Sequence, residues 1–171
     1  WPLDTETYGG SFLYHMKPNL VLLGFVVGLD YKNPYLSPYN ELQRWKHHPE
    51  VSKHLKGGRP VAYGARVLNE GGYQAIPKLT FPGGALVGCS AGFLNVAAIK
   101  GSHNAIKSGI ECAEALYENL DKEEVTDYEK RMRDSWTWDE LHRTRNASAG
   151  FKFGLLGGTL IQGVTGLVTR G

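Results

Sequence analysis

The sequence predicts an α+β chain in which mostly antiparallel strands are combined with amphipathic helices. Two runs rich in aromatic and β-branched residues flank Lys17-Pro18-Asn19, which is the pattern of a β-hairpin. Apolar residues recur every three or four positions between Ile106 and Leu120, as on one face of a helix. A third, apolar segment from Phe151 to Val168 predicts a further helix at the C-terminus.

The composition excludes several classes of protein. Apolar residues make up 42% and charged residues 21% of the 171 positions, which is typical of a globular chain. A net charge of +2 is too small to indicate nucleic-acid binding. The two cysteines, Cys89 and Cys112, form no C-x-x-C pair, so this chain alone predicts neither a metal site nor a disulfide framework. The G-x-G-x-x-G turn of dinucleotide-binding folds is absent from the sequence.

The first predicted elements are a hairpin and a helix. Strands are expected over Ser11–Met16 and Leu20–Leu29, and the nearly continuous apolar character of the second predicts burial on both faces. Ser37 is the expected N-cap of a helix that begins at Pro38 and ends near His48.

The middle of the chain predicts more strands. Val51–Arg59 is interpreted as a polar connector, followed by strands over Val61–Leu68 and Tyr73–Leu79 around a turn. Residues 81–84, Phe-Pro-Gly-Gly, predict a turn before a short buried strand at Ala85–Gly88.

Two amphipathic helices are expected next. The first carries an apolar face of Ile106, Ile110, Ala113, Tyr117 and Leu120. The second begins after Thr126 and runs to about Arg143, with Tyr128, Met132, Trp136 and Leu141 near one stripe. Trp136 and Trp138 cannot share one helical face, so one of them is expected at the surface.

The small-residue loop before the first of these helices is a candidate ligand site. A strand, a loop and a helix in succession allow backbone N–H groups and a helix N-terminus to approach an anionic or electron-rich ligand. Gly88, Gly92 and Gly101 remove the side chains that would block this approach. An ordinary strand-loop-helix unit is the alternative.

The apolar tail favours a lipid environment. Its five glycines each cost a water-exposed helix roughly 1 kcal/mol, whereas burial of each of seven Leu, Ile and Val side chains gains roughly 1.5–3 kcal/mol. Phe151–Val168 is at the lower length limit for a bilayer span. A helix buried within protein is the alternative.

The amino-acid sequences of several segments resemble those of one family. Residues 88–109, GCSAGFLNVAAIKGSHNAIKSG, resemble the second flavin-contacting segment of electron-transfer flavoprotein:ubiquinone oxidoreductase. YGGSFLYH, GLDYKNPYLSPYNELQRWKHHP and YGARVLNEGGYQAIPKLTFPGG are similar to the same family in the same order. The resemblance extends to about Asn146 and, more loosely, through the tail.

The resemblance implies an internal fragment of a flavin-dependent oxidoreductase with an α/β fold. Members of the family accept electrons from reduced electron-transfer flavoprotein, in fatty acid oxidation, and pass them through FAD and a 4Fe-4S cluster to ubiquinone. Their phosphate-binding turn and cluster cysteines lie outside the segment that this chain resembles, so the isolated chain is expected to be inactive. No catalytic residue is expected, because the chemistry consists of cofactor placement.

The resemblance also assigns binding residues. Gly9 and Gly10 are expected to lend backbone groups to the ubiquinone head group, against the alternative of a bulge before a strand. Cys89 stands where many related flavoproteins have Asp, so no carboxylate contact to the cofactor is expected, and a redox thiol is the weaker interpretation. His103 is either a proton donor or a structural histidine. The expected FAD contacts are Gly88, Cys89, Ser90, Gly92, Phe93, Asn95, Lys100, Gly101, Ser102 and His103.

Three regions and a location follow from the same resemblance. Residues 1–60 are expected to be the ubiquinone-binding region, 61–120 the C-terminal part of the FAD-binding domain, and 121–171 an amphipathic helix followed by a monotopic, membrane-surface segment. The location is the matrix side of the mitochondrial inner membrane or the cytoplasmic face of a bacterial one. The alternatives are a flavin-dependent prenyl reductase of the same superfamily and a non-catalytic membrane-docking module.

Overall fold

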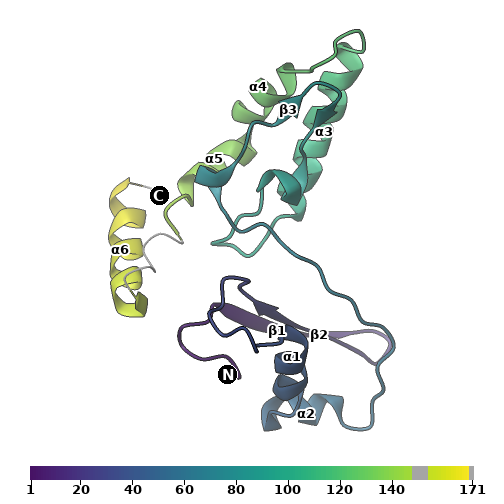
Figure 1. The fold of residues 1–171 in the computed structure, drawn as a ribbon, viewed down its shortest axis with the longest axis vertical. Helices are drawn as coiled ribbons and strands as arrows, with labels where there is room; N and C mark the ends of the chain where they lie inside the picture. The colour runs from purple at the N-terminus through teal and green to yellow at the C-terminus, as the bar shows by residue number, and fades with distance from the viewer. Residues whose placement is uncertain (148–153, 170–171) are drawn as a thin grey trace. The chain divides into compact units, whose positions relative to one another are not determined.

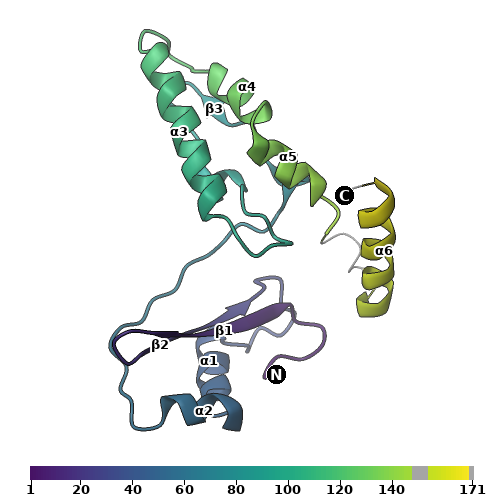
Figure 2. The same cartoon turned by 180° about the vertical axis from the view of Figure 1, so that it is seen from behind.

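The computed structural model describes residues 1–147 and 154–169, and it divides into two compact units (Figures 1 and 2). The first unit comprises Trp1–Ala65 and the second Arg66–Gly171. Each unit has its own arrangement of helices around a small antiparallel hairpin. The α+β character predicted from the sequence is therefore confirmed, although helices predominate over strands.

The first unit is built on the predicted hairpin. Strand β1 (Gly9–Met16) pairs antiparallel with β2 (Leu20–Val27), with Gly9 opposite Val27 and Met16 opposite Leu20. Asn19 takes a positive φ of 54° in the turn, a conformation that asparagine tolerates better than most residues. The turn residues therefore set the register of the pair.

Two short helices follow the hairpin. Helix α1 (Pro38–Lys46) begins as predicted, because the Ser37 side chain accepts a hydrogen bond from the backbone N–H of Asn40 at 3.4 Å. The prediction of a polar connector over Val51–Arg59 is wrong for its first half, because Pro49–Leu55 forms helix α2. The Nδ1 atom of His48 accepts the N–H of Glu50 at 3.2 Å, and a proline at the first position completes a helix start that histidine does not signal in a sequence.

Only one face of the hairpin is covered within this unit. Trp45 of α1 is buried and packs against Phe25 of β2, with ring centroids 6.1 Å apart. Phe12, Tyr14 and Val26 are exposed. The predicted burial of Leu20–Leu29 on both faces is therefore wrong for the described residues, because a single helix covers a two-stranded sheet on one side.

The predicted strands over Val61–Leu68 and Tyr73–Leu79 do not form. The first segment has no regular structure, and the second contains only the 3-10 turn η1 (Tyr73–Ala75). A strand needs a partner for its backbone groups. Within the described residues no strand pairs with this segment, and its Val61, Tyr63 and Val67 side chains are exposed.

The second unit contains a very short hairpin, β3 (Thr80–Phe81) and β4 (Gly84–Ala85), around the predicted turn. Gly83 has a φ of +78°, which this tight turn needs. The predicted strand at Ala85–Gly88 is mostly absent, because the 3-10 helix η2 (Gly88–Ala91) begins at Gly88.

Three helices complete the core of the second unit. They are α3 (Ser102–Glu118), α4 (Asp127–Arg133) and α5 (Trp136–Arg143), and β3 lies between α3 and α4 in both views (Figures 1 and 2). The single helix predicted over 127–143 is broken at Ser135, whose backbone is extended. The break changes the helical phase, so Thr137 is buried while Trp136 is exposed. The core consists of Leu79, Ala91, Phe93, Cys112, Ala115, Val125, Tyr128, Met132 and Leu141.

Helix α3 buries small and polar side chains and exposes large apolar ones, which is the reverse of an ordinary amphipathic helix. Its buried residues are Asn104, Ser108, Cys112 and Ala115. The predicted apolar face is exposed, and Ile106 and Tyr117 are 65% and 80% accessible. The helix is therefore confirmed, while its apolar stripe has no cover among the described residues.

The tail forms helix α6 (Gly154–Thr169), in agreement with the sequence. Leu156, Leu160 and Val164, which are four residues apart along the helix, are exposed and form the exposed stripe of α6. At 1.5 Å per residue its 16 residues are about 24 Å long, against about 30 Å for the hydrocarbon core of a bilayer. Among the described residues, none of the helices is long and apolar enough to cross a membrane. Phe151, Lys152 and Arg170 lie outside the described residues.

The buried tyrosine of α4 generates a stability prediction. Tyr128 is fully buried, and its hydroxyl donates to the carbonyl of Leu86 at 2.9 Å. Tyr128→Phe should lower the free energy of unfolding by about 1 kcal/mol, because it leaves that carbonyl without its donor. The same change at the exposed Tyr117 should stay within about 0.5 kcal/mol in chemical denaturation. Equal effects at the two positions would contradict a role for the hydrogen bond.

Candidate functional site

Gly9 and Gly10 occupy different environments on β1. The N–H of Gly28 donates to the carbonyl of Tyr8 at 2.8 Å, so Tyr8 and Gly28 form a hydrogen-bonded pair. Because such pairs alternate in antiparallel sheets, the backbone groups of Gly9 point to the open edge of β1, and those of Gly10 point to Val26. The backbone groups of Gly9 are therefore not used in the pairing with β2.

Only Gly9 is required by packing. A Cβ atom on Gly9 would lie 2.4 Å from the Val26 carbonyl oxygen, whereas one on Gly10 would have no described atom within 4 Å. The space beside Gly10 is therefore open. Along the same face of the hairpin lie exposed apolar side chains, namely Phe12, Tyr14, Met16, Leu22 and Val26. This set, which we call the outer hairpin face, combines an apolar surface with a nearby backbone edge.

The second candidate site surrounds η2, where two glycines have conformations that favour glycine. Gly88 and Gly92 have φ angles of +61° and +85°. The N–H of Gly88 donates to the Ser108 hydroxyl at 2.9 Å, and the N–H of Phe93 donates to the Gly88 carbonyl at 3.2 Å. The backbone here is thus folded tightly against α3.

The predicted FAD contacts differ in accessibility. Gly88, Gly92, Phe93 and Asn95 are buried, and Phe93 is part of the core, so its ring does not face a ligand site. Cys89, Gly101 and His103 are half-buried, and the Cys89 Sγ atom accepts the N–H of Asn69 at 3.3 Å. The exposed members are Ser90, Lys100 and Ser102.

Two of the exposed members, Lys100 and Ser102, lie at the start of α3. Gly101 is the N-cap residue, and no side chain of the described chain caps the helix. The first N–H groups of a helix carry partial positive charge, and Lys100 adds a full charge beside them. Lys100, Gly101 and Ser102 therefore form a location suited to an anionic or electron-rich group.

Glu140 of α5 fixes the loop that precedes α3. Its Oε1 atom accepts a hydrogen bond from Asn95 Nδ2 at 2.7 Å and lies 3.0 Å from His103 Nε2. Burial acts to raise the pKa of Glu140, but the hydrogen bonds from Asn95 and His103 outweigh it and hold the pKa below its ordinary value of 4.5. The ring of His103 stacks on Trp136, with centroids 5.8 Å apart. These contacts hold the His103 ring between the Glu140 carboxylate and Trp136.

Three residues that hold the η2 loop and the start of α3 in place, Asn104, Ser108 and Glu140, were not predicted from the sequence. Ser108 and Asn104 are fully buried polar residues of α3 that bond to the backbone of Gly88 and Phe93, the latter at 3.0 Å. Glu140 is separated from its partners by some 40 positions in the chain. The only sequence signal is the small and polar series Asn104, Ser108, Cys112, Ala115 and Asn119, which has helical spacing.

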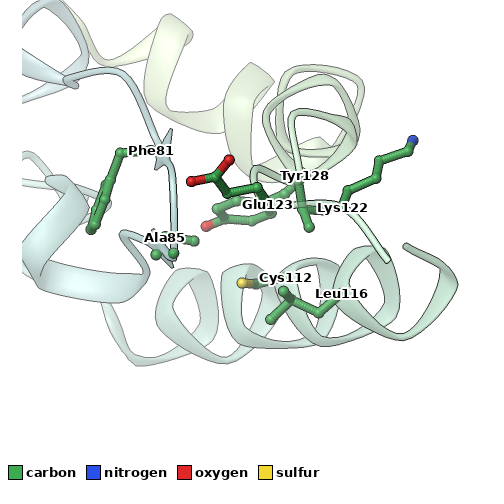
Figure 3. Close-up of a pocket in the computed structure, with 10 residues that line it drawn as sticks. Phe81, Ala85, Cys112, Leu116, Lys122, Glu123 and Tyr128 are labelled. Atoms are coloured by element: carbon green, nitrogen blue, oxygen red, sulfur yellow. The ribbon is translucent and has the colours of Figure 1, made fainter. Parts of the chain in front are cut away.

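A separate pocket of about 240 Å³ lies between the β3–β4 turn, α3 and the start of α4 (Figure 3). Its walls include Ala85, Cys112 and Leu116, with Tyr128 beside them and the charged Lys122 and Glu123 toward the α3–α4 loop. Burial raises the pKa of both the Cys112 thiol and the Tyr128 hydroxyl, so neither group is activated. None of the predicted site residues lines this pocket.

The described residues contain no cluster of three or more His, Cys, Asp or Glu side chains placed to hold a metal ion. An iron–sulfur cluster of the 4Fe-4S type requires four thiolates, and this sequence has two cysteines. The residues present therefore do not fit such a cluster.

Comparisons with known proteins agree with the motifs. Residues 1–68 match a family model described as ETF-QO, ubiquinone-binding. Over its whole length the chain is 54% identical to the mitochondrial electron transfer flavoprotein-ubiquinone oxidoreductase of Rattus norvegicus, across 184 aligned residues and 30% of that protein. The corresponding proteins of Arabidopsis thaliana and Caenorhabditis elegans are 53% and 50% identical, with 27% and 31% of their lengths covered.

The family-model match and the first compact unit nearly coincide, since they cover residues 1–68 and Trp1–Ala65. The first unit therefore corresponds to the domain that this ubiquinone-binding family model describes. The chain as a whole belongs to the electron transfer flavoprotein-ubiquinone oxidoreductase family, as the sequence motifs predicted. It spans about 30% of the length of the curated relatives that it matches.

The lowered pKa of Glu140 predicts a pH effect on stability. A carboxylate whose folded pKa is depressed stabilises the fold above its unfolded pKa, and this contribution is lost as pH falls through the folded value. Glu140→Gln should therefore lower the melting temperature at about pH 7, and the difference from the unmodified protein should shrink towards about pH 3. Asp139→Asn, an exposed change on the same helix, serves as the control. A difference that is constant with pH would contradict the assignment.

Proposed function

We propose that this chain is the quinone-site and flavin-closing part of an enzyme that transfers electrons from reduced electron-transfer flavoprotein to ubiquinone. The observation that carries the proposal is the outer hairpin face. It lies beside the Gly9–Gly10 edge, within the residues that match the ubiquinone-binding family model. Enzyme class, electron donor and acceptor come from the relatives' name, electron transfer flavoprotein-ubiquinone oxidoreductase.

The outer hairpin face suits a quinone. A quinone head group is an apolar ring with two carbonyl acceptors, so it needs an apolar surface and a hydrogen-bond donor at its edge. Phe12 and Tyr14 supply aromatic surface, and the edge N–H of Gly9 supplies the donor without side-chain bulk. One such hydrogen bond contributes only about 1 kcal/mol net, so it orients the head group more than it holds it.

The flavin segment is proposed to close the isoalloxazine end of an FAD site. Lys100, Gly101 and Ser102 would contact the cofactor, because they are accessible and lie at the uncapped start of α3, and Ser90 of η2 is exposed as well. When bound, FAD supplies the electron-accepting and electron-donating chemistry. The buried Gly88, Gly92 and Phe93 would shape the loop instead of contacting the cofactor through side chains.

The remaining assignments concern the intact protein. Residues 1–60 would form the ubiquinone-binding region, 61–120 part of the FAD domain, and 121–171 the α4–α5 helices and the membrane-associating segment. The 4Fe-4S cluster would be held by residues outside this chain. A membrane-surface location, on the matrix side in mitochondria or the cytoplasmic side in bacteria, accords with the exposed stripe of α6 and with the relatives' mitochondrial names. The prenyl reductase is not favoured, because the matched relatives are electron transfer flavoprotein-ubiquinone oxidoreductases.

The quinone assignment predicts a selective defect. In the intact enzyme Gly10→Val should slow ubiquinone reduction at least about tenfold and leave flavin reduction by electron-transfer flavoprotein unchanged, because the new side chain fills the open space on the outer hairpin face. Stopped-flow flavin reduction and a steady-state quinone assay measure the two steps separately.

Ser11→Val is the matched control, since Ser11 is the next residue of β1 and faces the opposite side of the hairpin. It should leave both steps intact. Equal losses in both steps for Gly10→Val would show that the glycine serves the fold and would overturn the quinone assignment.

The exposed stripe of α6 predicts membrane association without spanning. Replacement of Leu156, Leu160 and Val164 by Ser should release the intact protein into the soluble fraction with its flavin spectrum preserved, because the apolar contact with lipid is lost. Cysteines introduced at positions 152 and 170 should label from the same side of sealed vesicles. Labelling from opposite sides would establish a span, and release by salt alone would show that the stripe does not enter lipid.

A further inference from the structure

A single carboxylate joins both ends of the loop that leads into α3. The Oε1 atom of Glu140 is 2.7 Å from Asn95 Nδ2, and its two oxygens are 3.0 and 3.2 Å from His103 Nε2. Asn95 precedes the loop, and His103 lies in the first turn of α3. A shift of Glu140 would therefore move both ends of the loop.

The loop itself is closed at its base and tightly turned. The backbones of Asn95 and Lys100 exchange hydrogen bonds of 2.9 and 3.2 Å, and Asn95 Oδ1 accepts the N–H of Ala98 at 3.1 Å. Ile99 has a φ of +53°, an unfavourable conformation for a β-branched residue, and its side chain is exposed. Such a conformation persists only where surrounding contacts determine it.

Both hydrogen-bond partners of Glu140, Asn95 and His103, are themselves restrained by their surroundings. Asn95 is almost fully buried, so its amide has few alternatives once Glu140 is removed. His103 is held between the carboxylate and the ring of Trp136, which stands almost parallel to it at 8°. Trp136 and Glu140 both belong to α5, so one helix outside the loop fixes the orientation of its two ends.

We propose that Glu140 is a positioning residue for the flavin-closing segment. It acts through Asn95 and His103 and holds Lys100, Gly101 and Ser102 in the geometry that the cofactor meets. The inference rests on the proposed flavin function of this segment. It assigns to α5 a part in cofactor binding that its sequence does not signal.

The test compares variants of the intact, FAD-loaded enzyme. Glu140→Ala removes both contacts, and Glu140→Gln keeps an oxygen that accepts from Asn95 but loses the charge toward His103. Glu129→Gln is the matched control. Like Glu140, Glu129 is a half-buried carboxylate with two partners: it pairs with Arg133 and accepts the backbone N–H of Leu79. The measurements are the rate of FAD loss on dialysis, the visible circular dichroism of the flavin, the flavin reduction potential and the melting temperature.

Positioning predicts a graded result. FAD should be lost about tenfold faster from Glu140→Ala than from the unmodified enzyme, and Glu140→Gln should be intermediate. Both should change the flavin dichroism and shift the flavin potential, because the contacts that hold the flavin-closing segment are weakened. Glu129→Gln should lower the melting temperature without changing the flavin signals.

Two results would overturn the inference, and they separate it from the proposed function. If Glu140 and Glu129 variants lower the melting temperature alike and leave all flavin signals unchanged, Glu140 is structural, while the flavin function stands. If the unmodified intact protein carries no flavin spectrum, the proposed function fails and the inference fails with it.

Discussion

In the second unit, backbone groups must be hydrogen-bonded although its β3–β4 sheet has only two residues in each strand. Between Leu79 and Phe93 the chain forms only two-residue strands, so side chains of the helices bond backbone groups that a longer sheet would pair. Tyr128 donates to the Leu86 carbonyl, Ser108 accepts from Gly88, and Asn104 donates to the Phe93 carbonyl. This explains why α3 buries polar residues where an ordinary helix would bury aliphatic ones.

Local signals were sufficient for much of the first unit. The turn at residues 17–19 and the Ser37-Pro38 helix start are determined by neighbouring residues, and both appear as predicted. The strand expected at Val61–Leu68 failed, because pairing depends on a partner that the local sequence does not specify. The break at Ser135 was missed because apolar spacing continues across it, and only backbone geometry separates α4 from α5.

The candidate sites divide in the same way. The glycines at positions 9, 10, 88 and 92 could be identified from motifs, and the structure shows that packing requires glycine at position 9 but not at position 10. Glu140 could not be identified, since hydrogen bonds between residues some 40 positions apart leave no periodic signal. Glycines within a motif are thus easier to predict from sequence than a residue such as Glu140, whose hydrogen-bond partners are distant in the chain.

The reversed polarity of α3 has a consequence for handling this segment by itself. Ile106, Ile110, Tyr117 and Leu120 form a water-facing aliphatic and aromatic ridge, and water around such a ridge favours self-association. Salting-out ions strengthen that tendency, whereas charge-driven association weakens as ionic strength rises. Expression boundaries that leave this helix face uncovered would therefore favour aggregation, and turbidity would increase with added sulfate.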